Sequence, residues 1–365
     1  WARAKGNSNS SVAACPISKT FTAKSSILAV HPRGGSCRPE WFGSLSMSFP
    51  AMPRPPRSCL CYYFSPQRLM LRREIEDAFL HTSGPRALPQ SPLVPLPLGP
   101  HAPSAASSAP PPFALLVSHG AYGDSGPVLA HAYHALAARG VPPTVLLLGT
   151  NHRGLGARIA LSCRPWQTPL GVVEVDMELL GALEARGCVV DESGHAAEHS
   201  IENQLPFLQY LSPDVRIVPI GLGWLTLRES GQLATAILEA CRGRNVLLLA
   251  TTDYLHAGAG YCDQPAPGEH LHAFVRRRDA PVLEAIKACS PEGTVAAAGA
   301  RGMCGLWPTV VFLFLMLRLG FVKAQLLRYA VSGEISPAAG VTGFASWIFT
   351  PPDQKGSASL WSRAD

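Results

Sequence analysis

The chain has 365 residues, of which 47% are hydrophobic and 15% are charged, so it is long enough to bury a large core in one or two domains. Lys and Arg outnumber Asp and Glu by 12 to 4 in residues 1–110, whereas the remainder holds 19 against 21. The part of the chain with folded character is therefore close to neutral, which argues against a basic surface for nucleic acid.

The first 62 residues show neither a helical nor a strand period and mix Ser, Pro, Arg and Gly. This composition predicts a disordered segment, or an extension that does not belong to the native protein. Order is expected from residue 63 onward, where Ser65 can cap a helix and Pro66 suits its first turn. The ten prolines within 82–112 then predict an irregular connection.

From Phe113 onward, near-continuous apolar runs alternate with amphipathic stretches. This alternation predicts an α/β fold with a central, largely parallel or mixed sheet and helices on both faces. We expect one domain over 63–351 and a flexible tail at 352–365. The expected strands are 113–118, 144–149, 157–163, 215–223, 245–252, 324–333 and 340–349, and the expected helices include 127–139, 176–186 and 227–241.

The cysteines and the longest apolar run indicate in which cell compartment the protein is expected. Ten cysteines are scattered without a Cys-x-x-Cys pair, and no signal peptide is recognisable, which favours reduced thiols and a cytoplasmic protein. The run Leu306–Leu317 is interrupted by Pro308 and Thr309. It is too short to span a bilayer, so it predicts a buried helix and no membrane segment.

Three of the predicted strands lead directly into polar residues. His119 follows the first, His152 follows the second, and Asp253 and then His256 follow the strand at 245–252. In open α/β sheets, ligands bind beyond the carboxyl ends of the strands. We therefore expect these side chains to meet at one site.

Two imidazoles and one anionic group would hold Fe, Cu, Zn or Ni and leave coordination positions open. The third ligand could be a carboxylate or the thiolate of Cys304, where Gly305 lets the backbone approach closely. The alternative is that each His is an ordinary hydrogen-bonded loop residue, that Asp253 caps a turn, and that Cys304 is a small buried hydrophobe.

The stretch "AEHSIENQLPFLQYL", residues 197–211, places Glu198 and His199 just before a helix in which Pro206 suits the first turn. A buried carboxylate and imidazole are costly unless they are paired, and a metal-bound His needs such a partner. The pair therefore either orients ligands and faces substrate, or satisfies backbone amides around the turn.

In their order and spacing, several of these stretches resemble the Memo family, which is similar in fold to the LigB-type class III extradiol dioxygenases. The resemblance extends from about Phe64 to Phe349. It rests on "SHGAYGDSGPVLAHAY", "LGTNHRG", "EHSIENQLPFLQYL", "TTDYLH", "MCGLWP" and "LLRYAVSGEISPAAGVTGFA".

Carried over by motif, the resemblance implies that His119, His152 and Cys304 are metal ligands, for iron(II) or copper, with zinc possible. The dioxygenases have a carboxylate where this family has Cys, and a thiolate favours softer or redox-active metals such as copper as well as iron. The residues expected to orient ligands or to handle protons are Asp253, His256, Glu198 and His199.

One motif departs from the family, because the usual "PHAGY" is "SHGAY" here. If the second position after His119 needs a positive φ, Ala121 would strain the loop and shift that histidine.

Three functions remain open at this point. The first is a metal-dependent redox or dioxygenase-like enzyme acting on a small molecule or a peptide. The second is a non-catalytic binding or scaffold protein on an enzyme fold, and the resemblance implies Ammecr-like or radical-SAM proteins as partners. The third is a metal-free hydrolase that uses Ser118 or Ser200 with His199, although no GxSxG elbow supports it.

Overall fold

The computed structural model describes residues 53–54, 63–89, 113–300, 302–335 and 340–351. All of them fall within one compact unit, Trp41–Asp365. The disorder predicted for most of 1–62, the irregular connection at 90–112 and the flexible tail at 352–365 lie outside the described residues. The domain boundaries therefore stay predictions.

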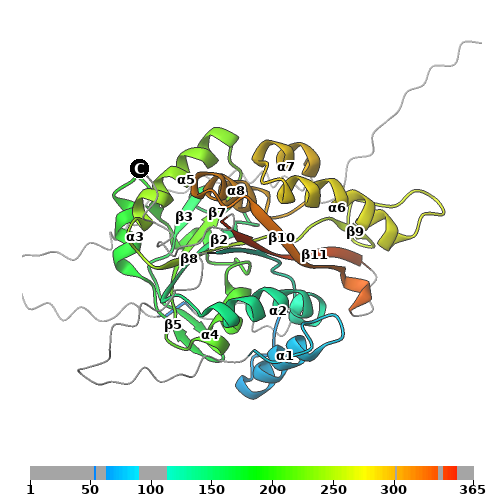
Figure 1. Cartoon of the computed structure of the whole chain (residues 1–365), viewed down its shortest axis with the longest axis horizontal. Coiled ribbons are helices and arrows are strands. Elements are labelled where there is room, and N and C mark those ends of the chain that lie inside the picture. Colours follow the sequence, from blue (N-terminus) through cyan, green and yellow to red (C-terminus); the bar gives the residue numbers. More distant parts are fainter. Residues whose placement is uncertain (1–52, 55–62, 90–112, 301, 336–339, 352–365) are drawn as a thin grey trace, which may run out of the picture. The chain divides into compact units, whose positions relative to one another are not determined.

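A nine-stranded sheet crosses this unit in the order β10-β11-β1-β8-β2-β7-β3-β6, with β9 paired to β11 (Figure 1). Its four central strands run parallel to one another and are buried at nearly every position. Burial on both faces explains why these strands are apolar throughout rather than at alternate positions. The four are β1 (Ala114–Val117), β8 (Val246–Thr251), β2 (Thr144–Thr150) and β7 (Arg216–Leu222).

Antiparallel pairs extend the sheet on both sides, so the sheet is mixed, as predicted. On one side β11 (Gly340–Thr350) pairs with β1, and β10 (Lys323–Val331) and β9 (His256–Gly258) pair with β11. On the other side β3 (Ile159–Leu161) is antiparallel to β7 and parallel to β6 (Val189–Val190). The strands β4 (Trp166–Thr168) and β5 (Gly171–Val173) form a separate hairpin.

Helices cover both faces of the sheet, as the alternating pattern predicted (Figure 1). One group packs together beside β1 and β11: α1 (Arg68–Leu80), α2 (Tyr122–Arg139) and α4 (Leu205–Leu211). The other group comprises α5 (Leu227–Cys241), α6 (Leu271–Lys287), α7 (Pro291–Ala298) and α8 (Leu306–Leu319), while α3 (Met177–Glu184) lies against β7 and α5. Short 3-10 turns are η1 (Glu192–Gly194), η2 (Glu202–Gln204) and η3 (Ser332–Glu334).

Helix starts show where local signals succeed and fail. The predicted bounds of α5 hold because Thr226 and Glu229 form a reciprocal capping box. In contrast, α1 begins at Arg68 rather than at Ser65, whose hydroxyl only closes a local turn with the amide of Gln67. Within the described residues, no helix is both long enough and apolar enough to cross a membrane.

The start of α2 was predicted at Pro127 but lies at Tyr122. The amides of Asp124 and Ser125 both donate to the carbonyl of Ala121, which begins the helix five residues earlier. The hydroxyl of Tyr122 donates to the carbonyl of Asn203 at 2.7 Å. This long-range contact fixes the first turn, and no short-range pattern reveals it.

Candidate metal centre

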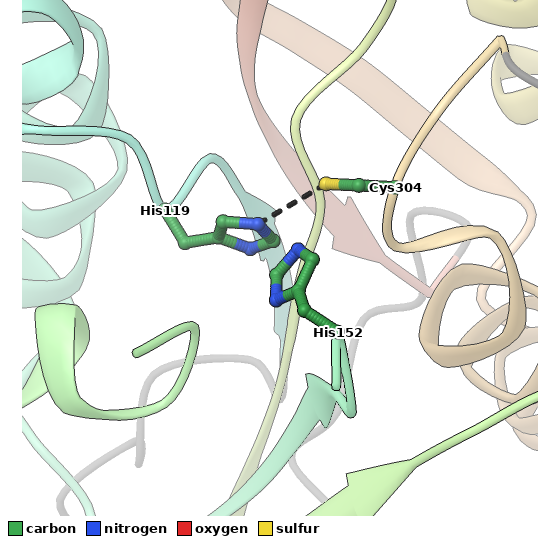
Figure 2. Close-up of side chains that lie close together, drawn as sticks. All are labelled: His119, His152 and Cys304. Atoms are coloured by element: carbon green, nitrogen blue, oxygen red, sulfur yellow. Dashed lines mark hydrogen bonds between the residues drawn. The ribbon is translucent and has the colours of Figure 1, made fainter. Parts of the chain in front are cut away.

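The carboxyl ends of three neighbouring strands meet at one edge of the sheet. Val117, the last residue of β1, lies beside Thr251, the last residue of β8, and β2 pairs with the other side of β8. Because the three strands are parallel, the residues that follow them emerge at the same level. Figure 2 shows that His119 and His152 point toward Cys304, which lies in the loop before α8.

The predicted ligands lie together. The Nε2 atom of His119 is 3.1 Å from Cys304 Sγ (Figure 2), and one ligand atom from each of His119, His152 and Cys304 lies within 4.8 Å of the other two. The two rings are almost perpendicular, at 87° with centroids 5.2 Å apart. His119 is buried whereas His152 is exposed, so the cluster is closed on one side and accessible on the other.

In both histidines, the Nδ1 atom lies within hydrogen-bond distance of another side chain. Nδ1 of His119 lies 3.0 Å from the hydroxyl of Thr251, and Nδ1 of His152 lies 2.9 Å from Oε1 of Glu198. A carboxylate can only accept, so Nδ1 of His152 carries a proton, and Nε2 is the nitrogen left to face the cluster. Outer-shell bonds of this kind fix the tautomer and the direction of a metal-binding imidazole.

Glu198 fulfils both roles that the sequence left open. Besides His152 Nδ1, its carboxylate accepts hydrogen bonds from the backbone amides of His152, His199 and Ser200, each at 2.8 Å. Burial raises the pKa of this carboxyl, but the hydrogen bond and charge of His152 outweigh that effect and hold the pKa well below its usual range. Glu198 is therefore an anion that braces its own loop and orients the ring.

Charge favours the thiolate at the centre. Burial raises the pKa of the Cys304 thiol, yet the charges and hydrogen bonds of His119 and His152 lower it to about 6. Burial likewise lowers the pKa of His152, while Cys304 and Glu198 together raise it to about 10. The thiolate is the form of cysteine that binds metals.

Asp253 connects the loops that carry His119 and Cys304. Its Oδ1 accepts from the backbone amide of His119 at 2.8 Å, its carbonyl accepts from the amide of Cys304 at 3.1 Å, and its own amide donates to Cys304 Sγ at 3.3 Å. The carboxylate is buried, and burial raises its pKa. Asp253 thus does more than cap a turn.

His256 begins β9 and neighbours this carboxylate. Burial lowers the pKa of the His256 ring, and the charge of Asp253 opposes that change. His256 is half-buried and packs beside Tyr261, with ring centroids 5.3 Å apart. It adjoins the centre through Asp253.

His199 lines the centre without being one of the predicted ligands. Its ring stacks on His152 on one face, with centroids 4.7 Å apart, and on Tyr63 on the other, at 4.3 Å. Burial, together with the charge of His119, lowers its pKa to about 3, so the ring is neutral at physiological pH. Tyr63 was not predicted, because an aromatic residue before a helix carries no signal of its distant partner.

The two serines proposed for a hydrolase are engaged elsewhere. The hydroxyl of Ser118 donates to the carbonyl of Ala345 at 3.3 Å, and that of Ser200 donates to the carbonyl of Thr150 at 3.2 Å. Both side chains are fully buried. Their hydroxyl hydrogens face backbone oxygens rather than an imidazole, which argues against the metal-free hydrolase.

The expected strain at Ala121 is absent, because its φ is −60°. The position in this loop that requires glycine is Gly120, because an added Cβ there would lie 2.7 Å from the ring of Phe344. The order Gly-Ala after His119 therefore suits this loop, and the departure from the usual motif does not displace His119.

One further residue beside the site, Arg54, came from no sequence signal. Arg54 lies in the stretch predicted to be disordered, yet it is 4% exposed and forms an ion pair at 2.7 Å with Glu202, which is also buried. The prediction of disorder is therefore wrong for Arg54, because these partners, far away in the sequence, hold it in place.

Comparisons with known proteins show which family this chain is similar to. A family model described as "Memo-like protein" matches residues 98–348. A MEMO1 family protein of Methanopyrus kandleri is 35% identical over 288 residues, which cover 76% of this chain and 93% of the relative. One of Ignicoccus hospitalis is 36% identical over 310 residues, covering 82% and 99%. The crystal structure of an uncharacterised protein of Escherichia coli K12 aligns with a TM-score of 0.39 and 11% identity, over 65% of this chain and 98% of that one.

Proposed function

The chain belongs to the Memo family, and on this basis we propose that it binds one iron(II) or copper ion through His119, His152 and Cys304 and serves as a redox or dioxygenase-like enzyme. The observation that carries the proposal is the convergence of three donor atoms within 4.8 Å, while the outer nitrogen of each ring is held by Thr251 or Glu198.

The donor set fits such an ion. Imidazole suits iron, copper and zinc, and thiolate adds a preference for softer or redox-active metals. The cluster favours a thiolate, and the side chain of His152 is 26% exposed, so the cluster can be approached from that side. When bound there, the ion would supply electron transfer or activation of a substrate and O₂. Zinc would fit the same donors without redox chemistry.

The surrounding residues would orient the reactants and move protons. The neutral ring of His199, stacked on His152, can accept a hydrogen bond from a substrate on the open side, but a pKa of about 3 makes it a weak base at neutral pH. Asp253, which is buried, and His256 form a second pair whose pKa values burial shifts toward the neutral forms. We propose His256 as the acid–base residue and His199 as a residue that faces the substrate, with Glu198 and Asp253 as the carboxylates that position the ligands.

As substrate we propose a small molecule or a peptide, on the basis of the family resemblance. An Ammecr-like or radical-SAM partner remains part of the proposal on the resemblance alone.

The direct test is metal content. The full chain is purified without oxygen, reconstituted separately with iron(II), copper or zinc, desalted and assayed for metal per chain. We expect one ion per wild-type chain and loss of the ion in His119→Ala and Cys304→Ala. His131→Ala and Cys188→Ala, which alter a histidine on α2 and a half-buried cysteine after α3, are the matched controls and should keep the metal. A wild-type chain that retains no metal would overturn the proposal and favour a non-catalytic binding protein.

A further inference from the structure

Arg54 provides a buried cation next to the proposed metal centre. Its Nη1 donates to Oε2 of Glu202 at 2.7 Å, and the side chains of this pair are 5% and 0% exposed. Taking both charges out of water is costly, and the cost is offset only when the geometry and the remaining hydrogen bonds are good. The other donors of the guanidinium show how this requirement is met.

Those donors bind the loop between η1 and η2. Nε and Nη2 donate to the carbonyl of His195 at 3.1 and 2.9 Å, and Nη2 also donates to the carbonyl of Glu198 at 2.7 Å. One side chain therefore contacts both ends of the segment 198–202. A planar fork with several donors can do this, whereas the compact ammonium group of lysine cannot reproduce the same set of bonds.

The main chain of Arg54 is held independently. Its amide donates to the carbonyl of Pro165, and its carbonyl accepts from the amide of Gln167 at 2.9 Å, so it forms a bridge beside β4. The guanidinium lies 4.0 Å from the centre of the Trp166 ring. The backbone of Arg54 is thus held beside β4 while its side chain binds the loop.

The loop held by Arg54 carries the carboxylate that orients His152. The carbonyl of Glu198 accepts from Arg54, while its side chain accepts from Nδ1 and the amide of His152. Displacement of the Glu198 backbone would move both hydrogen bonds to His152. A continuous set of bonds therefore runs from Arg54 through Glu198 to the imidazole.

We propose that Arg54 is a positioning residue of the centre: it fixes the Glu198 loop and, through Glu198, the tautomer and direction of His152. The inference rests in part on the proposed metal function. It also implies that the stretch preceding the first helix contributes to the site, so a protein shortened to start near residue 60 would lose an essential contact.

The test compares Arg54→Met, Arg54→Lys and the double variant Arg54→Met with Glu202→Gln in the full chain. The control is Thr144→Val, which removes a hydroxyl bound to Asp176 at the opposite end of β2. For each variant we would measure zinc affinity, the urea midpoint and, in metal-free protein, hydrogen–deuterium exchange of peptides covering 195–204.

Arg54→Met is expected to weaken zinc binding about 10–100-fold, the usual effect of losing an outer-shell partner, and to speed exchange over 195–204. Arg54→Lys should recover part of both losses. In the double variant, removal of the buried Glu202 charge that has lost Arg54 should raise the urea midpoint again. Affinity and exchange should stay altered, because the carbonyls of His195 and Glu198 still lack the Arg54 donors.

The inference is overturned if affinity returns together with the urea midpoint in the double variant, or if Thr144→Val loses as much affinity as Arg54→Met. Unchanged exchange over 195–204 in Arg54→Met would also overturn it. If wild-type protein binds none of zinc, iron(II) and copper, the proposed metal function fails, and exchange in the metal-free protein alone decides the role of Arg54.

Discussion

Glu198 Oε1 lies 2.9 Å from Nδ1 of His152, and this hydrogen bond determines which nitrogen of the ring faces Cys304. The two residues are far apart in the sequence, and one is exposed whereas the other is buried. Their pairing turns a loop carboxylate into part of the proposed centre, because the direction of the imidazole depends on the acceptor behind it.

Removal of that acceptor should weaken metal binding. We predict that Glu198→Ala lowers zinc or iron(II) affinity about 10–100-fold, measured by competition with a chromophoric chelator. Glu192→Ala is the matched control: this nearby carboxylate accepts from Ser162, Cys163 and Arg164 instead. Equal losses in both variants would contradict a specific role for Glu198.

The cysteine at the centre should be reactive when no metal is bound. Because the pKa of Cys304 is lowered to about 6, we predict that its alkylation by iodoacetamide reaches half of its maximal rate near pH 6, as thiolate replaces thiol with rising pH. Cys188, whose pKa burial raises to about 11, should remain almost inert at pH 7. Peptide mass spectrometry distinguishes the two sites, and His119→Ala should move the Cys304 midpoint upward.

Asp279 on α6 should make stability depend on pH. Burial raises its pKa to about 7, above the ordinary value of a carboxyl, so the folded protein holds this proton more tightly than the unfolded chain. Its contribution is complete below about pH 4 and is lost as pH rises through 7. We predict that Asp279→Asn does not show this loss. Relative to the wild type, its free energy of unfolding should rise by on the order of 2 kcal/mol between pH 5 and pH 8.

Urea unfolding at several pH values checks the prediction for Asp279. If the wild type and Asp279→Asn change in parallel between pH 5 and pH 8, the raised pKa is contradicted. The amide of Leu255 donates to Oδ1 of Asp279 and the hydroxyl of Tyr329 donates to Oδ2. In Asp279→Asn the single side-chain oxygen can still accept from Leu255, while the NH2 group can donate to the hydroxyl oxygen of Tyr329.

Gly120 should tolerate no side chain. In Gly120→Ala the new Cβ would meet the ring of Phe344 at 2.7 Å, and we predict a loss of about 1–3 kcal/mol from overpacking, together with weaker metal binding because His119 is adjacent. Gly123→Ala is the control, since its Cβ would meet nothing within 4 Å and alanine favours the helix. Thermal unfolding measures both, and a stable Gly120→Ala protein would contradict the steric argument.

The sequence predicted most of what depends on local pattern. The buried strands β1, β2, β7 and β8 are apolar throughout, so their existence, their parallel arrangement and the sheet edge to which they lead could be inferred. This is why His119, His152 and Asp253 were expected at one place. The sequence pattern offered Cys304 as one of two choices for the third ligand, and the family resemblance then favoured it. The comparisons confirm that resemblance.

Contacts between distant residues account for what was missed. Arg54 lies in a stretch whose composition predicts disorder, and partners far away in the sequence, among them Glu202, His195 and Glu198, hold it in place. The early start of α2 likewise depends on the contact of Tyr122 with Asn203. The short strands β4, β5, β6 and β9 were also missed, because two or three residues are too few to show a period.

X-ray absorption at the metal edge of the reconstituted protein tests the central claim most directly. With zinc bound, the account predicts one sulfur neighbour at about 2.3 Å and imidazole nitrogens at about 2.0–2.1 Å, with the sulfur signal replaced by a lighter atom in Cys304→Ser. A spectrum of wild-type protein with no sulfur neighbour, or one left unchanged by Cys304→Ser and His119→Ala, would contradict a metal centre built on His119, His152 and Cys304.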